Sequence, residues 1–186
     1  MADKVAAGAS MFYLMRHAEA GAFGVTDEER ELTGRGVRQA EAQGRALNEF
    51  LIDQTSPAAD RLPSLKIIQS SYLRAQQTAE LLIQNVSFLD KEPLTVKNIS
   101  PENSLEDVLE ALSKCFIEMP EQHFIVVCHM PVVAMLDGHC RKAAGDKGDS
   151  FSTAELRRYR FEDQESYRHL VGGGCDQPVD FLEAHL

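Results

Sequence analysis

Four basic side chains stand at the ends of apolar runs, and their types point to phosphoryl chemistry. Arg16 and His17 end the first run, and Arg74 comes just after a second. His129 follows a third. A guanidinium offers a planar fork that matches phosphate oxygens, and a neutral imidazole can attack phosphorus as a covalent nucleophile. These residues therefore predict a phosphoryl-transfer site.

The expected roles follow from charge. No carboxylate partner is expected among these converging donors, and a cationic pocket in a chain of net charge −10 favours an anionic occupant. We expect Arg16 and Arg74 to hold the phosphoryl oxygens, where other enzymes use Mg²⁺. No metal or other cofactor is therefore expected. Positive charge around the attacking imidazole favours its neutral form, which keeps a lone pair free.

The elements that must position these residues alternate between strands and helices. Buried strands are expected at Met11–Arg16 and Leu65–Gln69, a short strand at Leu94–Val96, a β-rich strand at Phe124–Cys128, and an edge strand at Ala154–Phe161. Helices are expected from Val37 to Leu51, Tyr72 to Gln84, Leu105 to Phe116, and from Pro131 to Leu136. This alternation predicts βαβ units and a largely parallel sheet, whose ligand site lies beyond the carboxyl ends of the strands.

Caps and breaks set the expected element boundaries. Thr33 is a candidate cap for the first long helix, and Asn103 or Ser104 for the third, with an acidic residue three positions on. Loops are expected at 18–31, 56–63 and 138–150, and a glycine turn at 172–174.

Composition narrows the classes of function. The chain has 186 residues, which fits one domain, and we expect a flexible leader at 1–10 and a single domain over 11–186. A pI near 5.0 argues against nucleic acid and anionic membrane surfaces as partners. The sequence has no 18-residue apolar run, and its four cysteines show no metal-site spacing. They are interpreted as thiols of a cytoplasmic protein.

Four segments together resemble the motifs of the histidine phosphatase superfamily. Residues 13–20 (YLMRHAEA) resemble its Arg-His-Gly signature, and 30–33 (RELT) its Arg-x-Leu-Thr segment. Residues 70–79 (SSYLRAQQTA) resemble its Ser-x-x-x-Arg-Ala-x-Gln-Thr element, and 126–131 (VVCHMP) its last motif. The resemblance implies a three-layer α/β sandwich like that of the phosphoglycerate mutases, with a mostly parallel central sheet flanked by helices.

Within this superfamily the chain is most similar to the small phosphohistidine phosphatases of the SixA type. Its short length, the segment 129–133 (HMPVV) and the segment 151–156 (FSTAEL) carry that similarity. The resemblance implies that His17 becomes phosphorylated and that Arg16, Arg74 and His129 bind the phosphoryl group. Arg30 is a further candidate phosphate contact.

The sequence departs from the family pattern at two places. Ala18 stands where the family has glycine, and a modest effect is expected. The Glu that serves mutase-like members as proton donor has no clear counterpart, and Glu102 is the nearest candidate general acid. A plain helix-start role for Glu102 is the alternative.

A weak acid suits the labile P–N bond of phosphohistidine better than a phosphate ester. The expected function is therefore a metal-independent phosphohistidine phosphatase acting on a phosphorylated protein. The alternatives are a phosphomonoesterase for small phosphorylated metabolites and a non-catalytic phosphate-binding module.

Overall fold

The computed structural model describes residues 10–22, 26–54, 65–120, 122–141, 148–161, 168 and 181–182. The loop expected at 56–63, the glycine turn at 172–174 and nearly all of the expected leader lie outside these residues. The single domain over 11–186 stays a prediction.

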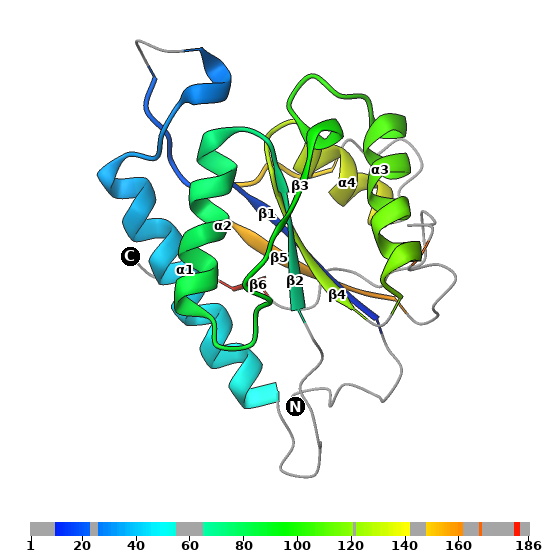
Figure 1. Ribbon diagram of the computed structural model, residues 1–186, viewed down its shortest axis with the longest axis horizontal. Coiled ribbons are helices and arrows are strands. Elements are labelled where there is room, and N and C mark those ends of the chain that lie inside the picture. The colour runs from blue at the N-terminus through cyan, green and yellow to red at the C-terminus, as the bar shows by residue number, and fades with distance from the viewer. Residues whose placement is uncertain are drawn as a thin grey trace.

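A six-stranded sheet forms the centre of the fold, in the order β3-β2-β4-β1-β5-β6 (Figure 1). Its strands are β1 (Ser10–Arg16), β2 (Leu65–Ser70), β3 (Leu94–Val96), β4 (His123–Cys128), β5 (Leu156–Phe161) and β6 (Phe181–Leu182). The pairs β3–β2, β2–β4 and β4–β1 are parallel, whereas β1–β5 and β5–β6 are antiparallel. The mostly parallel sheet expected from the alternation of elements is confirmed.

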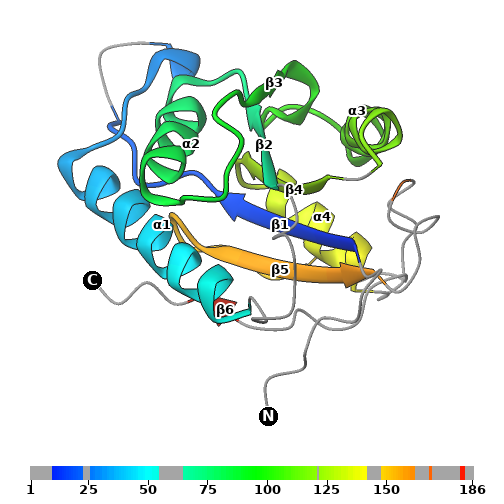
Figure 2. The same cartoon turned by 60° about the horizontal axis from the view of Figure 1, so that its bottom comes forward.

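Helices cover both faces of the sheet and make three layers (Figure 2). Helices α1 (Gly34–Gln54) and α2 (Leu73–Asn85) pack on one face. Helices α3 (Leu105–Glu118) and α4 (Val132–Cys140) pack on the other. Strand β1 serves both cores, because Phe12 and Leu14 point into one cluster while Tyr13 and Met15 point into the other. Burial on both faces explains why its sequence is continuously apolar rather than alternating.

Helix caps confirm the expected starts. The Thr33 hydroxyl accepts a hydrogen bond from the Gly36 amide at 3.0 Å, at the first turn of α1. Ser104 caps α3 and forms a reciprocal capping box with Asp107. Short 3₁₀ turns η1 (Asp27–Glu29) and η2 (Lys97–Ile99) lie in the connections before α1 and α3. Within the described ranges, no helix is both long and apolar enough to cross a membrane.

Two expected boundaries were wrong. Residues 154–161 were expected to form an edge strand, but β5 begins at Leu156 and lies between β1 and β6. The strand is buried. Its sequence looks polar because it contains Arg157 and Arg158, but the guanidinium groups of these residues lie over the rings of Phe151 and Phe50. Helix α4 continues beyond Leu136 to Cys140, so the first three residues of the loop expected at 138–150 are helical; Asp137, Gly138 and Cys140 are buried there.

Candidate active site

The site lies where β1 and β4 end side by side. Arg16 is paired in register with Cys128, so His17 and His129 leave neighbouring parallel strands at the same level. Their ring centroids are 5.0 Å apart. Arg74 approaches from the first turn of α2, just beyond the end of β2. The expected convergence of all four residues at one edge of the sheet is confirmed.

Hydrogen bonds fix the orientation and the tautomer of His17. The Arg74 Nε–H donates to His17 Nε2 at 3.1 Å. A guanidinium can only donate, so Nε2 must carry a lone pair. The proton therefore lies on Nδ1, which donates to the Ala18 carbonyl oxygen at 2.7 Å. The main chain is fixed too, because the His17 amide donates to the Cys128 carbonyl and the Ala154 amide donates to the His17 carbonyl.

Burial and positive charge keep both imidazoles neutral. Burial, and then the charges of Arg74, Arg16 and Arg30, lower the pKa of His17 to about 4, against the opposing hydrogen bond to Ala18. Burial, with His17 and Arg74 nearby, lowers the pKa of His129 to about 2. Both rings are thus uncharged at neutral pH, as the expected nucleophile requires.

The His129 imidazole is buried without a hydrogen-bond partner among the described residues, whereas the main-chain carbonyl of His129 accepts from the Val133 amide. Both ring nitrogens are enclosed and unpaired, and the side chain is 1% exposed. An edge-on contact with the Tyr72 ring, at 5.0 Å between centroids, holds the imidazole on its other side. An unpaired buried polar group is destabilising, so this ring is suited to an incoming oxyanion.

Arg16 is held by the segment that precedes β5. Its Nη1 donates to the Phe151 carbonyl oxygen at 2.7 Å, and its amide donates to the Glu155 carbonyl at 3.1 Å. Its buried Nε has no partner among the described residues. Arg16 is therefore oriented by one end of its guanidinium while Nε is left for a ligand.

Arg74 departs from expectation, because a carboxylate already pairs with it. The Asp27 Oδ2 lies 3.0 Å from Arg74 Nη2, and the Asp27 carbonyl accepts from Nη1. The idea that no carboxylate intervenes was wrong. Sequence distance hid this pair, since Asp27 and Arg74 are 47 positions apart. Arg74 thus has every nitrogen engaged, by His17 and by Asp27.

Arg30, the further candidate phosphate contact, is engaged at the same place. Its Nη1 lies 2.7 Å from Asp27 Oδ1, and its Nε donates to the Gly21 carbonyl. Asp27 therefore bridges Arg30 and Arg74, and the hydrogen bond from Arg30 is the main reason that the pKa of this carboxyl is lowered.

Glu102 reaches the site only through Tyr72. The exposed Glu102 carboxylate accepts a hydrogen bond from the Tyr72 hydroxyl at 3.0 Å. The Tyr72 ring in turn contacts His129 and lies 4.9 Å from the Arg74 guanidinium carbon. Burial, followed by the effect of Glu102, raises the pKa of Tyr72 to about 12. The sequence analysis identified Tyr72 only as the start of a helix. Its position two residues before Arg74 was the available signal that it lies at the site.

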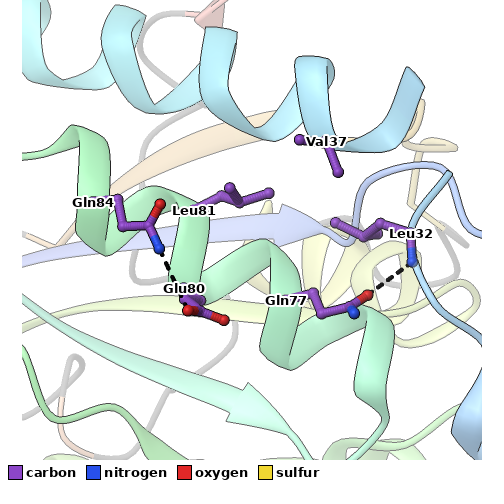
Figure 3. A pocket seen from close by; sticks show the side chains of 6 residues that line it. All are labelled: Leu32, Val37, Gln77, Glu80, Leu81 and Gln84. Carbon is purple, nitrogen blue, oxygen red and sulfur yellow. Dashed lines mark hydrogen bonds between the residues drawn. The ribbon is translucent and has the colours of Figure 1, made fainter. Parts of the chain in front are cut away.

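The remaining motif residues anchor the loop that carries the site. The Ala18 amide donates to Thr78 Oγ1 at 3.1 Å, and the Leu32 amide donates to Gln77 Oε1 at 2.8 Å (Figure 3). Figure 3 also shows a pocket beside Gln77, between α1 and α2, which includes none of the four basic residues. Ala18 is buried without positive φ; among the described non-glycine residues only Ala154 has it. The expected modest effect of alanine at this position fits that backbone.

A buried charged network supports the Phe151 segment. Arg157 lies 3.1 Å from the buried Asp137 and 2.6 Å from Glu155, and donates to the Ser150 carbonyl. Its guanidinium also covers the Phe151 ring at 3.8 Å. These contacts of Arg157 fix the segment that contains Phe151, whose carbonyl orients Arg16.

Cysteine thiols and groups of possible metal ligands are the other reactive side chains in the part of the chain that the structure describes. Cys115, Cys128 and Cys140 form no disulfide within the described ranges, whereas Cys175 lies outside them. Among the described residues, no three His, Cys, Asp or Glu side chains are grouped as metal ligands would be.

Sequence comparison relates the chain to two phosphatases. A phosphohistidine phosphatase SixA homologue of Haemophilus influenzae is 30% identical over 125 residues, which cover 65% of this chain and 71% of that protein. The mitochondrial serine/threonine-protein phosphatase Pgam5 of Drosophila mojavensis is 37% identical over 75 residues. That match spans 40% of this chain and only 22% of the Pgam5 chain. No family model matches the sequence.

Structure comparison agrees with the first of these relatives. The protein histidine phosphatase SixA in complex with tungstate superposes with a TM-score of 0.66 at 21% identity, over 83% of this chain and 90% of SixA. This agreement confirms the expected fold. Together with the Haemophilus influenzae relative, it shows that the chain belongs to the histidine phosphatase superfamily and is similar to its SixA-type members.

Proposed function

We propose that this chain is a phosphohistidine phosphatase that works through a phosphorylated His17. The observation that carries the proposal is the orientation of His17, whose Nε2 lone pair faces the Arg74 guanidinium while Nδ1–H is held by the Ala18 carbonyl. A nucleophile needs this fixed, neutral form. The SixA relatives support the same reaction class.

The reaction has two displacements at phosphorus. The hydrogen bond from Arg74 Nε–H to His17 Nε2 opens, and the freed Nε2 lone pair attacks phosphorus. The bond from phosphorus to the substrate imidazole nitrogen breaks, and the departing imidazole takes up a proton from water. Water then attacks phospho-His17, which releases inorganic phosphate and returns the electron pair to Nε2. Arg16, Arg74 and His129 hold the phosphoryl oxygens through both steps.

The unpaired groups support these binding roles. Arg16 Nε and both nitrogens of His129 are buried without partners among the described residues. A tetrahedral oxyanion supplies acceptors for such donors, with His129 taking the tautomer that points N–H at it. Arg30 would add its charge at the rim once Asp27 is displaced.

The position of Glu102 favours a P–N substrate. We propose that Glu102 is at most a weak proton donor, since its carboxylate is exposed and bonded to the Tyr72 hydroxyl. An ester needs protonation of an alkoxide, whereas the substrate imidazole leaves readily once protonated. A phosphorylated histidine of a protein is thus the substrate proposed.

Phosphate release from a phosphohistidine peptide tests the proposal. We expect turnover by the native chain, with or without a chelator, and none by His17→Ala. The matched control is His139→Ala, on α4, which should retain activity. Rapid quench should trap an acid-labile phosphoenzyme that is absent from His17→Ala. Faster release from a sugar phosphate than from the peptide would instead favour the metabolite phosphatase, and phosphate binding without turnover would favour the binding module.

A further inference from the structure

The Asp27 carboxylate takes the place that the proposed chemistry assigns to the substrate. It lies against Nη2 of Arg74 at 3.0 Å and against Nη1 of Arg30 at 2.7 Å. Both are the terminal nitrogens with which an arginine grips a phosphoryl group. The remaining nitrogens of Arg74 donate to the Asp27 carbonyl and to His17. Both terminal nitrogens of Arg74 therefore already have a partner in Asp27, and a phosphoryl group must compete with Asp27 for the fork of Arg74.

The two partners differ sharply in exposure. The Arg74 side chain is 4% exposed, whereas that of Asp27 is 53% exposed. Asp27 also lies on a single 3₁₀ turn with no buried residues, so little packing opposes its withdrawal. The arginine is the fixed member of the pair and the carboxylate is the one that can leave.

We infer that Asp27 is an internal competitor for Arg74 that sets the affinity of the site for phosphate and for phosphorylated substrates. The inference rests on the proposed function for its catalytic consequence, but not for its effect on phosphate binding. A carboxylate carries one charge on two oxygens, while a phosphoryl dianion carries two charges on three. The dianion is therefore the better partner for Arg74, Arg30 and the unpaired donors of Arg16 and His129.

Because Asp27 competes, the apparent affinity for any anion is the intrinsic affinity multiplied by the fraction of molecules in which Asp27 has left Arg74. Weak anions are excluded, and the product is released more readily because Asp27 returns to Arg74. A pocket of several basic donors without such a competitor would retain inorganic phosphate and inhibit itself.

The test is calorimetric titration of the full chain with inorganic phosphate. In Asp27→Asn the side chain keeps its size but loses its charge, so the phosphate Kd should fall by roughly tenfold, a difference of about 1.4 kcal/mol. Glu28→Gln removes the same charge from the neighbouring exposed residue and should change Kd by less than about twofold, since surface charges are screened. Asp27→Ala should behave like Asp27→Asn, and circular dichroism should show that each variant is folded.

Kinetics provide the second measurement. With the phosphohistidine peptide, phosphate should inhibit Asp27→Asn at a lower concentration than it inhibits the native chain. A phosphate Kd that is unchanged or weaker in both Asp27 variants, or no phosphate binding in any form, would overturn the inference. Loss of turnover with weaker phosphate binding would place Asp27 in the chemistry instead. If the native chain fails to hydrolyse phosphohistidine while Asp27→Asn still binds phosphate more tightly, the proposed function fails and the competition remains.

Discussion

The buried carboxylate of Asp137 gives the sharpest test of how the site is supported. It accepts hydrogen bonds from the Tyr159 hydroxyl and from the Asp149 amide at 2.9 Å. It also pairs with Arg157 at 3.1 Å and with Arg141. Asp137→Asn keeps the shape but turns an amide NH₂ toward these donors, and it removes the charge that balances Arg157.

The expected loss can be worked from these contacts. Breaking a buried ion pair destabilises a protein by about 3–5 kcal/mol. Arg157 keeps Glu155 at 2.6 Å and Arg141 keeps Asp149 at 2.8 Å, so the lower end applies. We expect the free energy of unfolding to fall by about 3 kcal/mol, and Tm by roughly 6–12 °C for a chain of this size.

Urea unfolding followed by far-UV circular dichroism measures this loss, because the chain has no tryptophan to report by fluorescence. The control is Asp149→Asn, whose carboxylate is 66% exposed and should contribute less than about 1 kcal/mol. A loss in Asp137→Asn no larger than in this control would refute the reasoning.

The same residue predicts a pH dependence. Burial alone would raise the pKa of Asp137, but the Tyr159 and Asp149 hydrogen bonds and the charges of Arg157 and Arg141 outweigh it, and the native pKa is lowered. A carboxyl whose pKa is lower in the folded state stabilises the fold above its unfolded value of about 3.9. The stability difference between the native chain and Asp137→Asn should therefore be full at neutral pH. It should shrink as the pH falls through the lowered pKa, which acid titrations of both forms would show.

Three further results are expected. Arg74→Lys loses the forked guanidinium and should lower kcat/KM for the peptide by about a hundredfold, which corresponds to the loss of roughly 3 kcal/mol from two charge-assisted hydrogen bonds. A change within about threefold would contradict a forked contact. The His17 ring signal in an NMR titration should move with a midpoint near pH 4, with the neutral imidazole present above it, and a midpoint near 6.5 would contradict the effect of burial. Tyr72→Phe keeps the ring against His129 and should retain most activity, whereas Tyr72→Leu should weaken phosphate binding; abolished activity in Tyr72→Phe would show that Glu102 acts through the Tyr72 hydroxyl.

The residues of the site were predictable wherever a strand end fixes them. His17 and His129 directly follow β1 and β4, and parallel pairing brings such positions together whatever the side chains are. Arg74 was found from its motif, and its helix from apolar spacing. These predictions depend on local patterns and on one rule of sheet topology.

The partners of those residues were not predictable. The pairing of Asp27 with Arg74 joins positions 47 apart, and the contact of Arg16 with Phe151 joins positions 135 apart. Neither contact leaves a periodic signal, because each depends on how a connection folds back over the sheet edge. The burial of β5 was not predictable for the same reason. Arg157 and Arg158 make its sequence polar, and only the folded chain places their guanidinium groups over aromatic rings.

The placement of β1 has a consequence for when the candidate site can form during synthesis. Its two neighbours, β4 and β5, lie at residues 123–128 and 156–161, so the strand that leads into His17 pairs with segments that are synthesised much later. Contacts over such separations slow folding, because a long loop must close before they form. Helices α1 and α2 can associate early, but Arg74, on the first turn of α2, cannot contact His17 until β1 is in place. A ribosome-bound chain that ends before β5 should therefore expose one edge of β1 without a partner strand. Such an edge can pair with other chains and aggregate, and chaperones prevent this.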